Sequence, residues 1–75
     1  MQNEIDLNIS VYETLEKNPE LIDLLVELGF TPLKNPLMRQ TVGKATTLKQ
    51  GCKMLGIDLN TLTKTLQWNG YKVIG

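Results

Sequence analysis

The sequence predicts a mainly α-helical fold: a compact bundle of about four to five short helices, with a small two-strand ribbon as a candidate link between the chain ends. The length of 75 residues is enough for one domain and no more, so residues 1–75 are expected to form a single unit. Apolar residues recur at helical spacing through the middle of the chain, between N-cap and glycine signals. Alternating apolar and polar residues near both ends indicate short strands.

The first nine residues alternate between apolar and polar types, which is the period of a half-buried strand. Ser10, with Glu13 three residues later, forms a capping-box pattern. This pattern predicts a short helix that ends near Lys17. The buried face of that helix is expected to consist of Val11, Leu15 and Tyr12.

The second helix has the clearest signals in the sequence. Asn18 is a good N-cap residue and Pro19 fits the first helical turn, so we expect the helix to begin there. Gly29 ends it, because glycine readily takes the positive φ found after a helix. Its buried stripe is predicted to contain Leu21, Leu24, Leu25 and Leu28, widened by Ile22 and Val26.

The middle of the chain begins with a predicted loop over residues 30–34. Asn35 and Pro36 then repeat the helix-start signal, and they predict a short helix that runs to about Val42. Gly43 is expected to close that helix.

Thr47, with Gln50 three residues later, forms another capping box, and Gly56 ends the helix that follows. Gly51 lies inside this helix, where glycine costs about 1 kcal/mol relative to alanine. We expect a close crossing by another backbone to compensate. The predicted inward residues are Leu48, Cys52, Met54 and Leu55.

Asp58 caps the last predicted helix, and Asn69 with Gly70 forms a turn signal. Residues 71–74 then form a short strand, which is predicted to pair with residues 4–8 and bring the two ends of the chain together. The predicted inward residues of the last helix are Leu59, Leu62, Leu66 and Trp68.

Composition argues against several classes of function. Eight basic residues balance eight acidic ones, whereas nucleic-acid binders usually show a basic excess. The sequence has no His, the commonest general acid–base residue, and its one Cys can form neither an intramolecular disulfide nor a zinc site. We therefore expect no catalytic residues, no metal ligands, no cofactor, no enzymatic activity and no nucleic-acid partner.

The sequence also gives expectations about location. No basic segment followed by an apolar run opens the chain, so no secretory signal is expected. The apolar stretch over residues 21–28 is broken by Asp23 and Glu27, and it is far shorter than the roughly 20 residues that span a bilayer. A chain this small without disulfides is typical of a reducing compartment. We expect a cytoplasmic protein with no membrane partner.

Cys52 allows two interpretations. It could be a reactive thiol, because Lys49 and Lys53 are possible neighbours and a nearby cation lowers a thiol pKa. It also falls in the apolar register of its helix, which favours a buried structural role. Met38 and Met54 are interpreted in the same way, as residues that fill the core.

The segment from Phe30 to Gly43 is the candidate binding surface. It carries two prolines and an N-cap in a loop-to-helix context, and loops held on rigid scaffolds often carry function. The alternative is an ordered connector whose apolar residues fill the core. The candidate surface residues are Phe30, Pro32, Leu33, Lys34, Asn35, Pro36, Met38 and Arg39.

Several short motifs together carry a resemblance to a known family. They are Gly29-Phe30, Asn35-Pro36-Leu37-Met38, Thr41-Val42-Gly43, Thr47-Leu48 and Met54 to Asp58. On these residues the chain resembles the bacterial and archaeal domain-of-unknown-function family 1858, from Ile5 to Gly70. The resemblance implies a compact helical domain, found alone or as an N-terminal module of larger proteins, and it implies no established activity.

A cousin family, associated with the hybrid-cluster protein, bears a redox Cys-x-x-Cys in the loop after the second helix. Aligning Gly29, Phe30 and Pro36 places that motif on residues 32–35, where Pro32 and Asn35 replace both cysteines. Disulfide exchange needs the thiol pair, so that chemistry is not implied here. A similar module precedes the di-iron domain of iron–sulfur cluster repair proteins, which suggests a link to redox or metal-centre proteins by analogy alone.

These observations support three hypotheses. The first is a non-catalytic interaction or accessory module, whose partner is another protein or a second copy in a homodimer. The second is a sensor for a small ligand or anion, bound at the helix start at Pro36 with Lys34 and Arg39 nearby. The third is a redox protein that acts through Cys52. The absence of catalytic groups favours the first.

Overall fold

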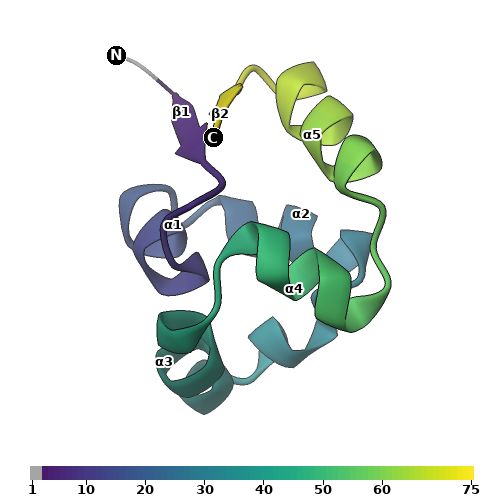
Figure 1. Cartoon of the computed structure of the whole chain (residues 1–75). Coiled ribbons are helices and arrows are strands. Elements are labelled where there is room, and N and C mark those ends of the chain that lie inside the picture. Colours follow the sequence, from purple (N-terminus) through teal and green to yellow (C-terminus); the bar gives the residue numbers. More distant parts are fainter. Residues whose placement is uncertain (1–2) are drawn as a thin grey trace.

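The helices and strands follow one another in the order that the sequence predicts. A computed structural model describes residues 3–75. Two short strands at the chain ends enclose five α-helices and one 3-10 turn (Figure 1). In chain order the elements are β1 Glu4–Asp6, α1 Val11–Lys17, α2 Leu21–Leu28, η1 Thr31–Lys34, α3 Pro36–Ala45, α4 Leu48–Leu55, α5 Leu59–Trp68 and β2 Lys72–Ile74.

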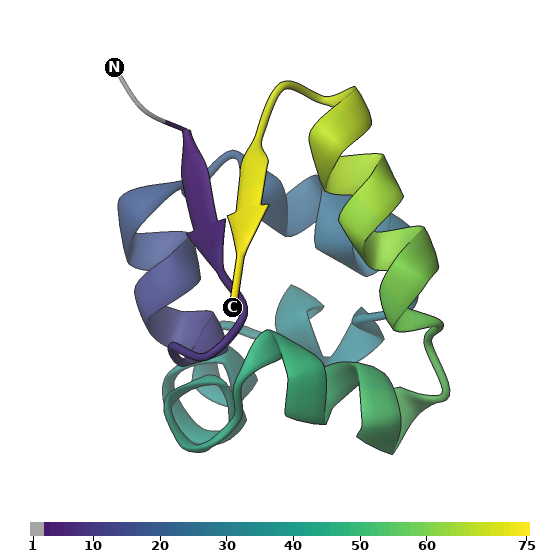
Figure 2. The ribbon, with the colours of Figure 1, turned by 45° about the horizontal axis from the view of Figure 1, so that its top comes forward.

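The ribbon that joins the chain ends is a parallel one. β1 pairs with β2 with Ile5 opposite Val73, and Figure 2 shows the two strands side by side and pointing the same way. Parallel strands need a long crossover, and here the helices α1 to α5 provide it. The predicted pairing of the last strand with the first is therefore confirmed.

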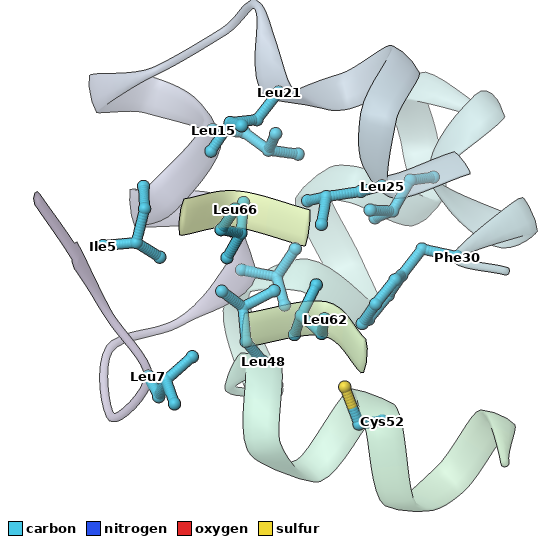
Figure 3. Close-up of a cluster of buried hydrophobic side chains, with 12 residues drawn as sticks. Ile5, Leu7, Leu15, Leu21, Leu25, Phe30, Leu48, Cys52, Leu62 and Leu66 are labelled. Carbon is cyan, nitrogen blue, oxygen red and sulfur yellow. The ribbon is translucent and has the colours of Figure 1, made fainter. Parts of the chain in front are cut away.

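One apolar core holds the helices and the ribbon together. Its buried members run from Ile5 to Leu66 and come from every α-helix except α3, and Val73 of β2 packs against them, so the core ties segments that are far apart in sequence (Figure 3). The side chains of Leu25, Leu48, Leu62 and Leu66 are 0% exposed. Burying each such leucine contributes about 2 kcal/mol. The buried apolar residues are Ile5, Leu7, Val11, Leu15, Leu21, Leu25, Phe30, Leu33, Leu48, Cys52, Leu62 and Leu66.

Four helices begin where the sequence places an N-cap. Ser10, Asn35, Thr47 and Asp58 each accept a hydrogen bond from a backbone N–H two or three residues later. At Thr47 the capping box is complete, because the Gln50 side chain also accepts from the Thr47 N–H at 3.0 Å. These predictions are confirmed, since a cap depends only on residues that are close in sequence.

The predicted start of α2 at Asn18 is wrong. The Asn18 N–H donates to the Thr14 carbonyl at 3.0 Å, so Asn18 closes α1 instead. Pro19 and Glu20 form a turn, and α2 begins at Leu21 without a side-chain cap. The helix still ends as predicted at Gly29, which has a φ of +125°.

The region from Phe30 to Gly43 is more helical than predicted. Thr31–Lys34 forms the 3-10 turn η1 in place of a loop, with Pro32 in its first positions, where a missing N–H costs nothing. α3 continues through Gly43 to Ala45. A Cβ on Gly43 would lie 3.5 Å from the Tyr12 backbone nitrogen, an ordinary contact distance, so Gly43 lies where α3 packs on α1 and not at a helix end.

Three residues predicted to face inward lie at the surface. Trp68 is 92% exposed, Met54 68% and Leu55 41%. Trp68 follows the buried Leu66 by two positions, which is about 200° around the helix axis. Met54 follows the buried Cys52 by the same two positions, so each side chain points well away from the core residue that precedes it.

Among residues 3–75, no helix has both the length and the apolar character needed to cross a bilayer.

Candidate functional site

An open apolar pocket lies where η1, α3 and α4 meet, with one residue from α1 completing its wall. We call it the α3–α4 pocket. Its volume is about 200 Å³. Its lining residues are Val11, Phe30, Pro32, Leu33, Met38, Val42, Gly43, Thr46, Gly51, Met54 and Leu55.

The floor of the α3–α4 pocket is part of the core. Phe30 is 3% exposed and Leu33 is 5% exposed, so both are fixed by packing. The Phe30 ring lies directly against Gly51 of α4, where an added Cβ would stand 2.6 Å from Phe30 Cε1. The expectation of a backbone crossing at Gly51 is therefore wrong, because an aromatic side chain fills the space that glycine leaves.

The rim of the α3–α4 pocket is apolar and open to solvent. Val42 is 37% exposed, and Met54 and Leu55 are more exposed still. Leu37, on the same helix as Val42, is 65% exposed and does not line the pocket. Several large apolar side chains therefore remain in water around one depression.

The candidate surface divides into two halves. Phe30, Pro32, Leu33 and Met38 line the α3–α4 pocket, and the other four residues lie outside its lining. Those four are Lys34, Asn35, Pro36 and Arg39.

The polar half of the candidate surface builds the corner between η1 and α3. The Asn35 side chain accepts from the Leu37 N–H at 2.9 Å as the N-cap of α3. Arg39 Nε donates to the Leu33 carbonyl at 2.6 Å, and Arg39 Nη2 donates to the Lys34 carbonyl at 3.4 Å. These contacts close the 3-10 turn against α3 and hold the pocket floor in place.

The candidate surface omits the contribution of α4. Gly51, Met54 and Leu55 recur at the spacing of one helix face, yet Met54 and Leu55 were expected in the core. The available signal was the width of the apolar stripe on α4, which is broader than one buried face requires. Val42, predicted only as the end of its helix, also lines the pocket.

Cys52 is a buried thiol. Its side chain is 2% exposed, and Figure 3 shows its sulfur among the core residues. Burial raises the pKa of the Cys52 thiol, and the negative charge of Asp58 raises it further. A thiol of this kind stays protonated and is a poor nucleophile. Within residues 3–75, no group of three or more His, Cys, Asp and Glu side chains could hold a metal ion.

Comparison with known protein families identifies the family of this chain. Residues 5–63 match the family described as Domain of unknown function (DUF1858), and that span contains every residue that lines the α3–α4 pocket. The chain belongs to the DUF1858 family. The resemblance seen in the sequence motifs is therefore confirmed.

This DUF1858 domain is also similar to a solved structure. A crystal structure described as the conserved domain protein from Streptococcus pneumoniae TIGR4 is 53% identical in sequence, and the match covers 100% of this chain and 95% of that one. The TM-score is 0.96, so the two folds agree along the whole chain. The comparison with curated proteins gives no match.

Proposed function

We propose that this DUF1858 domain is a non-catalytic protein-interaction module that binds its partner through the α3–α4 pocket. The observation that carries the proposal is the combination of a rigid buried floor, formed by Phe30 and Leu33, with the exposed apolar rim of Val42, Met54 and Leu55. Contiguous apolar surface of this kind marks interaction sites in soluble proteins. A partner side chain that enters the pocket would remove this surface from water.

The size and chemistry of the α3–α4 pocket favour a protein partner over a small ligand. Ligand sites usually enclose about 300–1,000 Å³ and present a few convergent polar groups. This pocket has a volume of about 200 Å³ and is lined by apolar side chains and glycines, with Thr46 as the one exception. One or two apolar side chains of a partner match that space, as the anchor residues of protein interfaces do.

The alternative of an anion sensor at the start of α3 receives less support. That site needs free backbone N–H groups and free cationic donors. Here the Asn35 side chain already accepts from the Leu37 N–H, and the Arg39 guanidinium donates to two backbone carbonyls. An anion would have to displace contacts that hold η1 and α3 together.

A non-enzymatic role is part of the same proposal. The sequence has no His, and its single thiol is buried in the core. The link to redox or metal-centre proteins rests only on the architecture of resembling families. A second copy of this chain, as in the expected homodimer, is one form that the protein partner can take.

The proposal is tested by removing the apolar rim without touching the core. Met54→Ser changes a side chain that is 68% exposed, so we expect stability to change by no more than about 0.5 kcal/mol. Trp68→Ser is the matched control, because Trp68 is 92% exposed and does not line the pocket. Crosslinked complexes formed in the native cytosol are compared by mass spectrometry for both variants and the unmodified protein.

We expect Met54→Ser to lose specific crosslinked partners that Trp68→Ser retains. Sedimentation of the purified variants shows whether the lost partner is a second copy of the chain. If Met54→Ser keeps every partner of the unmodified protein, the α3–α4 pocket is not the interaction site.

A further inference from the structure

The charges of this chain are balanced in total but divided along the sequence. Residues 1–28 contain seven acidic residues and one basic residue, whereas residues 29–75 contain seven basic residues and one acidic residue. The near-zero net charge therefore conceals an acidic N-terminal part and a basic remainder. Charge asymmetry of this kind affects which partners associate and how fast they do so.

The α3–α4 pocket belongs to the basic part. Every lining residue except Val11 comes from residues 30–55, and that span contains five basic residues and no acidic one. The five are Lys34, Arg39, Lys44, Lys49 and Lys53.

Four of these cations stand next to the pocket. Each is the direct sequence neighbour of a lining residue, so the two Cα atoms lie about 3.8 Å apart. The lining neighbours are Leu33, Met38, Gly43 and Met54. Each of these four cations therefore lies within about one helix diameter, 10 Å, of the pocket, which is comparable with the screening length at physiological salt.

Two of these four cations have contacts with uncharged groups. Arg39 donates to backbone carbonyls, and the Lys44 ammonium lies 4.8 Å from the centre of the Tyr12 ring. A carbonyl oxygen and an aromatic ring carry no net charge and neutralise neither cation. Lys34 and Lys53 are exposed. Lys34 and Arg39 also line a second depression together with Asp23 and Glu27, and these carboxylates offset their charge. The positive charge beside the α3–α4 pocket is therefore carried by Lys44 and Lys53.

From this juxtaposition we infer that the α3–α4 pocket receives an amphipathic segment of another protein, with apolar anchor residues flanked by Asp and Glu. The inference rests on the proposed function and adds the chemistry of the partner. The apolar anchors fill the pocket between η1, α3 and α4. The carboxylates face Lys44 and Lys53, which raises the association rate and rejects basic segments.

An acidic amphipathic segment fits the pocket better than a nucleic acid or a second copy of this chain does. A nucleic acid would use the cations but has no apolar side chain to place over Phe30, Met38 and Met54. A second copy would have to present apolar side chains from its acidic part, residues 1–28, and pairing of that kind is head-to-tail, which gives a ring or a filament and not a two-fold dimer.

The test is a selection from a random peptide library displayed against the whole domain, with the Met54→Ser variant used to subtract peptides that bind elsewhere. We expect the Met54-dependent peptides to combine apolar residues at helical spacing with an excess of Asp and Glu. Affinities of the selected peptides are then measured in 0.05 M and 0.5 M salt, on the unmodified protein and on charge variants.

Lys53→Glu, next to the pocket, should weaken an acidic peptide at least fivefold in 0.05 M salt, and the difference should shrink in 0.5 M salt. Lys64→Glu is the matched control, because Lys64 is an exposed lysine on helix α5 and does not border the pocket. It should change the affinity by less than twofold.

The possible failures have different meanings. Met54-dependent peptides that are neutral or basic would overturn the acidic partner and leave the proposed function intact. A library that yields no Met54-dependent peptide would overturn both. Binding of a single-stranded DNA oligonucleotide that is lost in Lys53→Glu and kept in Met54→Ser would assign the basic surface to nucleic acid. A dimer of the unmodified domain in sedimentation that acidic peptides dissociate and that Met54→Ser does not form would assign the pocket to a second copy.

Discussion

Gly51 and Gly43 are both helical glycines in the wall of the α3–α4 pocket, and alanine should have opposite effects at the two positions. At Gly51 the new Cβ would lie 2.6 Å from Phe30 Cε1. Carbon atoms in contact are ordinarily about 3.5–4.0 Å apart, so the ring or the helix has to move by roughly 0.9 Å. Phe30 is 3% exposed and is packed in the core on every side except the α3–α4 pocket that it lines, so a shifted ring has to move into that pocket.

The change in the free energy of unfolding caused by Gly51→Ala is the sum of two opposing effects. Replacing glycine by alanine inside a helix stabilises it by about 1 kcal/mol. Overpacking a filled core costs about 1–3 kcal/mol. We therefore expect Gly51→Ala to destabilise the domain by about 1 kcal/mol, which lowers Tm by about 4–8 °C in a domain of this size.

Gly43→Ala is the matched control. Its added Cβ would meet Tyr12 atoms at 3.5 Å or more, an ordinary contact distance, and Gly43 does not have a positive φ. The helix-propensity gain then stands alone, and the domain should become more stable by about 0.5–1 kcal/mol.

Urea unfolding of both variants measures these effects, provided that the m-values match that of the unmodified protein. Phe30→Leu in the Gly51→Ala background should recover about 1 kcal/mol relative to the sum of the single changes, because the clash is with the ring. If Gly51→Ala stabilises the domain as much as Gly43→Ala does, the ring is free to move and the reasoning is wrong.

Three further measurements test other parts of the structure. The Tyr71 hydroxyl donates to the Glu20 carboxylate at 2.6 Å, which raises the pKa of Tyr71 to about 12 and lowers the pKa of Glu20. The folded state therefore keeps a proton that the unfolded chain loses above pH 10, so the free energy of unfolding should fall as pH rises from about 10 towards 12, and Tyr71→Phe should reduce that slope. The stabilisation that the Glu20 carboxylate contributes should be lost as pH falls below the ordinary pKa of Glu20, and Tyr71→Phe should reduce that loss as well. Equal pH profiles of the free energy of unfolding for the two proteins would refute both statements. Cys52 should resist alkylation by iodoacetamide at pH 8 in the folded state and react at the rate of a free thiol in 6 M urea, whereas rapid labelling of the folded protein would restore the redox hypothesis. Trp68→Ser should change the free energy of unfolding by no more than about 0.5 kcal/mol, and a loss above 2 kcal/mol would show that the indole packs on the domain.

Local signals in the sequence predict the order and the starts of the helices. Ser10, Asn35, Thr47 and Asp58 were all expected as N-caps, and each is one in the structure. A cap is a contact between residues two or three apart, so the sequence contains everything needed to predict it. The pairing of the two terminal strands was also predicted, because few other partners exist for them in a chain this short.

Features that depend on distant residues could not be predicted in the same way. Gly43 is a residue type that often ends a helix, but it lies inside α3, where that helix packs on Tyr12, a residue 31 positions away in the sequence. Met54 is an apolar residue of the kind that usually fills a core. It lies two positions beyond the buried Cys52, however, and α4 is covered by the rest of the domain on one side only. Sequence periodicity shows that a stripe is wide, and only the packed structure shows which edge of it remains open.

The candidate site was predicted in part for the same reason. The segment that contains Phe30 and Leu33 was singled out because it joins two helices through prolines, and it forms the pocket floor. The opposite wall comes from α4, whose Gly51 makes room for the Phe30 ring. The walls of this pocket come from segments that are separated in sequence. The pattern of one segment predicts one wall and says nothing about the other.

The parallel direction of the terminal ribbon has a mechanical consequence. The chain enters β1 beside Lys72 and leaves β2 beyond Ile74, so the two ends of the chain depart from opposite ends of the paired strands. A force that pulls these ends apart slides one strand along the other and loads their hydrogen bonds together, instead of breaking them one after another. The short ribbon should therefore act as a shear clamp, and the helices should unravel only after it yields.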